Sequence, residues 1–239
     1  MHFRIMPAFT TCGDAQSQRN IRGIFMTQEE TTETQLPLNA EHLAAAERAH
    51  WRPKSYFERA QMSDIFDRPA PVEADIGCGE GAFIIALAQR HPERNFLGTE
   101  RLLGRVEKVC RRAAHEHLTN VRVLRLESSW TLQHLLPKEC ISIAHVGFPD
   151  PWPKRHHQRR RMIQDEFMQV VRGALAPGGE LRIKTDDLPY FQWIEKVIAN
   201  ATGFERIEWP FDPTYPITNF ERRFLERGMP IYSARLRKV

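Results

Sequence analysis

The stretch ADIGCGEGAF, residues 74–83, joins a short apolar run to a segment of helical length. Its glycines at alternate positions, Gly77, Gly79 and Gly81, allow a tight chain reversal and a close approach of the backbone to a ligand. Glu100 follows about 20 residues later, the spacing at which a carboxylate reaches a ribose diol in α/β nucleotide-binding units. The stretch therefore predicts an α/β sheet with a small-molecule site at its first turn.

The chain beyond this turn alternates between short apolar runs and amphipathic segments of helical length. We expect strands at residues 72–76, 95–99, 121–126, 141–148, 180–184, 204–209 and 231–236. We expect helices at residues 81–90, 102–117, 130–136, 160–175 and 190–200, with a sharp stop at APGG, residues 176–179. This alternation predicts a doubly wound, mostly parallel, seven-stranded sheet of the α/β class.

The first 70 residues differ in character from the rest of the chain. Residues 1–38 are polar and lack a sustained period, so we expect a disordered or flexible extension, within which Met26 is a candidate for the true start. Residues 39–70 carry helical propensity on both sides of Pro53 and predict an N-terminal helical arm. Residues 71–239 form the predicted domain, without a visible repeat.

Composition excludes several classes of protein. The chain has 239 residues, a net charge of +4 and 41% hydrophobic residues, which is ordinary for one globular domain. No apolar run approaches the roughly 20 residues that span a bilayer, and the first residues lack a signal peptide's apolar core. The cysteines have no metal-ligand spacing: Cys12, Cys78, Cys110 and Cys140. We therefore expect a cytoplasmic protein that binds neither metal nor membrane.

Acidic residues stand at or near the ends of the first four predicted strands. They are Asp75, Glu100, Glu127 and Asp150. Each alone is typical of a turn or a helix cap, but the carboxyl ends of parallel strands share one edge of the sheet, where ligands bind. Asp75 lies within the first turn and would crowd a pyrophosphate. S-adenosylmethionine carries an α-ammonium and a sulfonium and no phosphate, so the pattern favours it over a dinucleotide.

A second motif, FPDPWPKRHHQRRR at residues 148–161, follows the fourth predicted strand. Two prolines fix a turn around Asp150, and a basic run follows that includes Lys154, Arg159, Arg160 and Arg161. Cations at a helix N-terminus oppose the helix dipole, so we expect this run to bind phosphates rather than simply to solvate the helix. Trp152 either stacks on a base or packs beneath the turn.

With these motifs the chain resembles the bacterial tRNA (guanine-N7)-methyltransferases, a class I S-adenosylmethionine-dependent family. The resemblance covers residues 71–239 and rests on DIGCGEG, FLGTE, FPDPWPKRHHQRRR, KTDD at 184–187 and TNFERR at 218–223. It implies methylation of a guanine N7 in tRNA, in the variable loop, with Asp150 as the catalytic residue. It implies cofactor contacts from Asp75, Glu100, Glu127 and Asp150, in addition to the glycine loop with Gly77 and Gly79. It implies substrate contacts from Lys154, Asp186, Thr218, Asn219, Phe220 and Glu221.

The chain departs from the family pattern at four positions. The family usually has Glu where Asp75 stands and Asp where Glu127 stands, so each charge is kept while its reach shifts by one methylene. Gly147 replaces a larger residue, and Asn219 stands where a basic residue is common.

Two other functions remain open from the residues alone. One is a class I methyltransferase that acts on an exocyclic amine of a nucleic acid, because an acid-proline-aromatic turn also suits that reaction. The other is a non-catalytic RNA-binding protein on the same fold. The sequence leaves open whether the protein is a monomer or a homodimer.

Overall fold

The computed structural model describes residues 39–210, 212 and 215–239, which belong to one compact unit. The predicted extension at residues 1–38 lies outside the described residues. No helix in the described part of the chain combines the length and apolar character that crossing a membrane requires.

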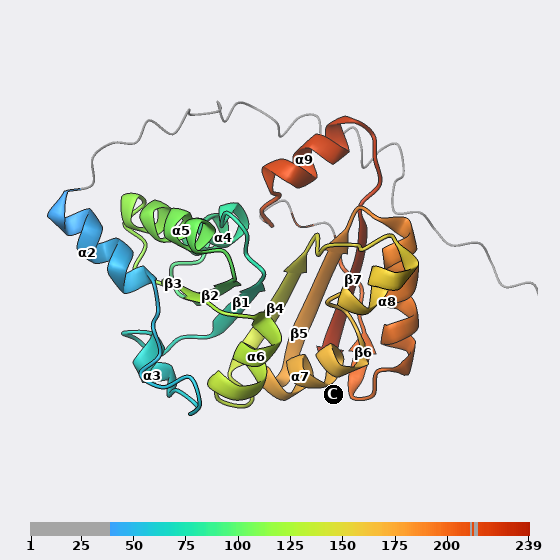
Figure 1. Cartoon of the computed structure of the whole chain (residues 1–239), viewed down its shortest axis with the longest axis horizontal. Coiled ribbons are helices and arrows are strands. Elements are labelled where there is room, and N and C mark those ends of the chain that lie inside the picture. Colours follow the sequence, from blue (N-terminus) through green and yellow to red (C-terminus); the bar gives the residue numbers. More distant parts are fainter. Residues whose placement is uncertain (1–38, 211, 213–214) are drawn as a thin grey trace, which may run out of the picture. The chain divides into compact units, whose positions relative to one another are not determined.

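A seven-stranded sheet in the order β3-β2-β1-β4-β5-β7-β6 forms the centre of this unit (Figure 1). Its strands are β1 (Val72–Ile76), β2 (Asn95–Glu100), β3 (Val121–Arg125), β4 (Ile141–Gly147), β5 (Leu175–Thr185), β6 (Phe204–Arg206) and β7 (Tyr232–Lys238). The first five strands are parallel, and β7 runs antiparallel to both β5 and β6. This order confirms the predicted doubly wound sheet.

Helices connect the strands and cover the sheet. They are α2 (Ala40–Ala49), α3 (Met62–Ile65), α4 (Ala82–Arg90), α5 (Leu103–His115), α6 (Ser128–Trp130), α7 (Asp165–Ala174), α8 (Leu188–Asn200) and α9 (Asn219–Glu226). A π-helical turn, Thr131–Leu135, extends α6, and a 3₁₀ helix, Arg155–Arg160, precedes α7. One apolar cluster joins α4, α5 and the end of α2 to β2 and β3, while a larger one joins α7 and α8 to the sheet.

The predicted N-terminal arm is packed into the same unit as the sheet. The Trp51 amide donates to the carbonyl of Val123 at 2.9 Å, and His50 forms a parallel bridge with the same residue. Trp51, Ile65 and Phe66 are buried in the larger core cluster. The chain leaves helical conformation after Ala49, ahead of Pro53, as the proline predicts.

Three of the predicted boundaries are wrong. The strand expected at 204–209 ends at Arg206. The helix expected at 160–175 begins only at Asp165, because the Gln164 side chain donates to the carbonyls of Arg159 and Arg161 and holds residues 161–164 out of helical conformation. The expected APGG turn lies inside β5, where Leu175 pairs with Ile141 and Glu180 with Ile143. The residues between them form a bulge, for which Gly178 has φ +72°.

Candidate active site

The glycine loop between β1 and α4 has the conformation that its sequence predicts. Gly77, Gly79 and Gly81 all have positive φ, at +76°, +57° and +77°. A Cβ on Gly81 would lie 2.5 Å from Val109, so this glycine lets α4 approach α5. A Cβ on Gly79 would meet nothing within 4 Å, which leaves open space beside the loop.

Two hydroxyls tie this loop to the neighbouring strand ends. The Gly77 amide donates to Thr99 Oγ1 at 3.2 Å, and that oxygen lies 2.8 Å from Ser128 Oγ. The ends of β1, β2 and β3 therefore share one hydrogen-bonded network. Neither Thr99 nor Ser128 was predicted as a site residue, although each lies next to a predicted acid in the sequence.

Asp75 is buried at the end of β1 without a cationic partner. Its residue is 6% exposed, and its carboxylate makes no hydrogen bond or ion pair with the described residues. Burial raises the pKa of Asp75 to about 7, and the nearby charge of Glu100 adds to the shift. A cation bound beside Asp75 would lower the pKa of its carboxyl group again and so favour the ionised form.

Glu100 and Glu127 are both oriented by backbone amides. Glu100 Oε1 accepts from the amides of Arg101 at 2.7 Å and Leu102 at 2.9 Å, while Oε2 lies 3.6 Å from Arg105 Nη1. Glu127 caps α6, because its Oε2 accepts from the amide of Trp130 at 2.8 Å. In each carboxylate, the other oxygen receives no hydrogen bond within the described part of the chain.

These residues fit the chemistry of S-adenosylmethionine. The unpaired Asp75 suits an ammonium group, the amide-oriented Glu100 suits a pair of ribose hydroxyls, and Gly79 faces free space. The three features lie at the carboxyl ends of β1 and β2. The role of each residue stays a prediction.

The turn that carries Asp150 is held in an unusual backbone conformation. Phe148 and Trp152, which flank it, have φ of +51° and +44°, a region that non-glycine residues rarely adopt. Between them, Pro149 and Pro151 restrict the chain on either side of the exposed Asp150. Trp152 contacts the His157 ring at 5.7 Å, so its ring packs within the motif.

Arg161 is buried, unlike the exposed phosphate contact that the sequence predicts. It is 4% exposed, and its Nε donates to the Pro151 carbonyl at 2.8 Å. Its guanidinium lies over the rings of Tyr190 and Trp193, both in α8. The side chain therefore braces the Asp150 turn from inside, which corrects the expectation that it binds substrate.

The other cations of the motif point into solvent. Lys154, Arg159 and Arg160 are exposed and form no ion pair within the described residues. Arg160 lies over the Trp152 ring, with 5.1 Å from its guanidinium carbon to the ring centroid. Their roles in binding phosphate stay predictions.

The predicted substrate segment lies next to the Asp150 turn. Thr218 caps α9 by accepting from the Glu221 amide at 3.0 Å, and Lys184 at the end of β5 pairs with Glu221 Oε1 at 2.5 Å. Phe220 meets the Phe148 ring at 5.0 Å between centroids. Figure 1 shows α9 beyond the carboxyl end of β4. Asn219 is the first residue of this helix.

Asp186 and Asp187 divide two roles between them. Asp187 caps α8, because its Oδ1 accepts from the Tyr190 amide at 2.6 Å. Asp186 is half-buried, and its carboxylate makes no hydrogen bond or ion pair with the described residues. It is therefore available for substrate, as the resemblance implies.

Comparison with known proteins identifies the family. A family described as a putative methyltransferase matches residues 69–234. The tRNA (guanine-N(7)-)-methyltransferase of Syntrophotalea carbinolica is 34% identical over 185 residues, covering 76% of this chain and 80% of that protein. The enzyme of the same name from Nitrosospira multiformis is 36% identical, over 74% of this chain and 79% of that protein. The chain belongs to the tRNA (guanine-N7)-methyltransferase family.

Solved structures agree on the fold of this family member. An antibiotic-related methyltransferase has a TM-score of 0.56 at 16% identity, over 80% of this chain and 98% of the other. The 16S rRNA methyltransferase KamB has a TM-score of 0.54 at 17% identity, over 76% and 94%. At these identities the likeness concerns the fold alone.

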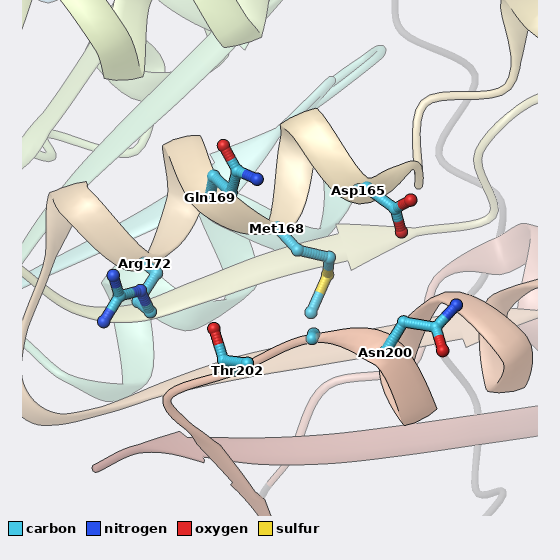
Figure 2. A pocket seen from close by; sticks show the side chains of 7 residues that line it. Asp165, Met168, Gln169, Arg172, Asn200 and Thr202 are labelled. Atoms are coloured by element: carbon cyan, nitrogen blue, oxygen red, sulfur yellow. The ribbon is translucent and has the colours of Figure 1, made fainter.

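A separate groove lies between α7 and the end of α8 (Figure 2). Its lining includes Asp165, Met168, Arg172, Asn200 and Thr202, and none of the predicted site residues. The motifs of the family therefore leave this groove unused.

Proposed function

We propose that this protein transfers a methyl group from S-adenosylmethionine to N7 of a guanine in tRNA, giving 7-methylguanosine. We extend the proposal to a guanine of the variable loop, as the family resemblance implies. The observation that carries it is the position of Asp150. The residue stands exposed on a doubly proline-restricted turn, and Phe148 in that turn contacts Phe220 of the substrate segment at 5.0 Å.

The chain's own residues account for binding of the cofactor. Asp75 would pair with the α-ammonium, Glu100 would accept hydrogen bonds from the ribose hydroxyls, and Glu127 would contact the adenosine end. Gly77 and Gly79 let the backbone approach closely. The bound cofactor supplies an electrophilic methyl group on a sulfonium.

Asp150 has two tasks in this proposal. The N7 lone pair of guanine is already free, so the site needs no strong base, and alignment supplies most of the catalysis. The Asp150 carboxylate accepts hydrogen bonds from guanine N–H groups and so sets the angle at which N7 faces the methyl group. Its negative charge also offsets the positive charge that develops on the purine.

The rest of the tRNA is held by charge. Lys154, Arg159 and Arg160 present solvent-exposed cations beside the Asp150 turn, where phosphates would lie. Asp186 and the Thr218–Glu221 stretch would contact the target nucleotide. A guanine in folded RNA is poorly accessible at N7, so we expect local opening of the tRNA.

The decisive experiment incubates the protein with an unmodified tRNA transcript and S-adenosylmethionine labelled in its methyl group, followed by nucleoside analysis. We expect label in 7-methylguanosine. Label on an exocyclic amine would favour the alternative methyltransferase, and absence of both label transfer and cofactor binding in a calorimetric titration would favour the non-catalytic protein.

A further inference from the structure

A chain of buried polar contacts runs beneath the site from β1 to the segment ahead of α9. Arg94 Nη1 lies 2.6 Å from Glu73 Oε1, and the other oxygen of Glu73 lies 2.8 Å from His145 Nε2. His145 Nδ1 lies 3.1 Å from the Tyr215 hydroxyl. No motif of the family accounts for these residues.

The protonation states of Glu73, His145 and Tyr215 determine which group donates in each of these hydrogen bonds. Burial favours a neutral Glu73, but the hydrogen bond from His145 and the charge of Arg94 hold its pKa below the usual value. Burial lowers the pKa of His145 and raises that of Tyr215, which keeps both neutral. His145 Nε2–H therefore donates to the Glu73 carboxylate, and its Nδ1 accepts from the Tyr215 hydroxyl.

This series of hydrogen bonds lies between the cofactor loop and the substrate segment. His145 is the register partner of Asp75 in the neighbouring strand. Phe83, in the first turn of α4, contacts the His145 ring at 5.1 Å and the Tyr215 ring at 5.4 Å. Tyr215 stands three residues before Thr218, the cap of α9.

Lys184 links Tyr215 to the far end of the same segment. Its Nζ lies 4.8 Å from the Tyr215 ring centroid and 2.5 Å from Glu221 Oε1. The guanidinium carbon of Arg182 lies 5.7 Å from the centroid of the Tyr215 ring. Two cations of β5 thus contact the face of Tyr215, while its hydroxyl is tied to His145 in β4.

We propose that Tyr215 and His145 are positioning residues for tRNA, whose hydrogen bond fixes residues 215–221 over the strand ends so that Thr218–Glu221 can meet the target guanine. This inference rests on the proposed function. The hydrogen bond acts through α9 and touches neither the cofactor nor the reacting atoms. Its loss should therefore weaken the productive binding of tRNA more than it affects chemistry.

The test is Tyr215→Phe, which keeps the ring and its contacts with Phe83 and Lys184. Steady-state methylation of an unmodified tRNA transcript should show a KM for tRNA raised about fivefold to tenfold, because the variant leaves His145 Nδ1 buried without a donor. We expect kcat at saturating tRNA within about twofold of the parent and unchanged calorimetric affinity for S-adenosylmethionine. Tyr232→Phe is the matched control: it removes a phenol hydroxyl in β7 that makes no hydrogen bond within the described residues.

A pair of substitutions at the partner residue separates positioning from packing. His145→Leu removes the acceptor and should raise KM as Tyr215→Phe does, with no further rise in the double variant. His145→Asn offers an amide oxygen near the place of Nδ1 and should restore part of the loss. Thermal denaturation of each variant identifies any failure to fold, and Tyr215→Phe decides the matter if the His145 variants do not fold.

Failure of this inference is distinguishable from failure of the proposed function. If the parent methylates tRNA while Tyr215→Phe leaves the KM for tRNA unchanged, the positioning role is overturned alone. The positioning role is also overturned if Tyr215→Phe lowers the affinity for S-adenosylmethionine as well as raising the KM for tRNA. That pattern indicates a general loss of structure. A parent that does not methylate tRNA overturns both.

Discussion

Arg161 Nε donates to the carbonyl of Pro151 at 2.8 Å, from a guanidinium that lies 4.9 Å from the Tyr190 ring centroid. The buried cation therefore supports the turn from the protein interior, while Asp150 in the same turn is exposed to solvent. The Tyr190 hydroxyl in turn accepts from the Ile163 amide at 3.1 Å, which ties the first turn of α8 to the segment ahead of α7. A residue from within the basic run thus determines where the catalytic candidate is held.

Replacement of Arg161 should affect turnover rather than tRNA affinity. Arg161→Lys keeps the charge but loses the planar group that both stacks on Tyr190 and reaches the Pro151 carbonyl. We expect the single-turnover methylation rate at saturating tRNA and cofactor to fall about tenfold or more, because a displaced turn misaligns Asp150. Arg159→Lys, an exposed counterpart, should change little. Weaker tRNA binding at an unchanged rate would return Arg161 to the phosphate contacts.

Neutralising the exposed cations should have the opposite effect. Arg159→Gln combined with Arg160→Gln is expected to weaken tRNA binding and to reduce its salt dependence by about one to two counterions. The measurement is the slope of log affinity against log salt concentration, with the single-turnover rate at saturating tRNA as a control. An unchanged slope would show that neither side chain meets a phosphate.

The affinity for S-adenosylmethionine should depend on pH through Asp75. Burial raises the pKa of this carboxyl to about 7 in the cofactor-free protein, so the group is largely neutral below that pH. Pairing with an ammonium requires the carboxylate, and we expect affinity to fall about tenfold per pH unit well below pH 7. Calorimetry at pH 6 in buffers of different ionisation enthalpy should detect proton release on binding. Equal affinities at pH 6 and pH 8 would contradict this role.

The same carboxyl should limit the stability of the cofactor-free protein. Because its folded-state pKa is raised above the ordinary value of 3.8, Asp75 contributes stability at low pH that is lost as the pH rises towards about 7. Asp75→Asn should therefore raise the midpoint of thermal unfolding by several degrees at pH 8, and much less at pH 5. The same variant should bind cofactor poorly. A midpoint shift that is equal at both pH values would exclude ionisation as its cause.

The sequence predicted what depends on local patterns. Short apolar runs identified the strands, and the glycine spacing identified the loop, because both follow from the period and the backbone freedom of neighbouring residues. Glu100 and Glu127 became candidates for the cofactor site through their places at strand ends, and their roles there stay predictions. Local patterns did not show that Asp187, rather than its neighbour Asp186, caps α8. They also left open whether Trp152 packs within its motif or stacks on a base.

What the sequence did not predict depends on residues far apart in the chain. Arg161 looks like Arg159 and Arg160, and only contacts with α8, about 30 residues later, turn it inwards. His145 and Tyr215 are 70 residues apart, and no local period pairs them. The strand order sets His145, in β4, between β1 and β5, and the segment ahead of α9 brings Tyr215 to it.

Asp150→Asn tests the role of the catalytic candidate most directly. The prolines on either side restrict the backbone, and Arg161 holds the Pro151 carbonyl, so an amide of the same shape should occupy nearly the same position. The variant loses the negative charge that, in the proposed function, accepts hydrogen bonds from guanine and offsets the charge forming on the purine. Removal of a preorganised electrostatic group typically costs about 10²–10³ in rate, and we expect a loss of that size.

Single-turnover methylation at saturating tRNA and cofactor separates this chemical effect from binding. The thermal unfolding midpoint should match that of the parent, and cofactor affinity should stay largely intact, because Asp75 and Glu100 remain in place. Asp165→Asn is a suitable control, since Asp165 lies at the start of α7, lines the groove of Figure 2 and belongs to none of the motifs. A variant at Asp150 that turns over as fast as the parent would reduce the residue to a former of the turn. The guanine would then have to be aligned by Asp186 and the Thr218–Glu221 stretch instead.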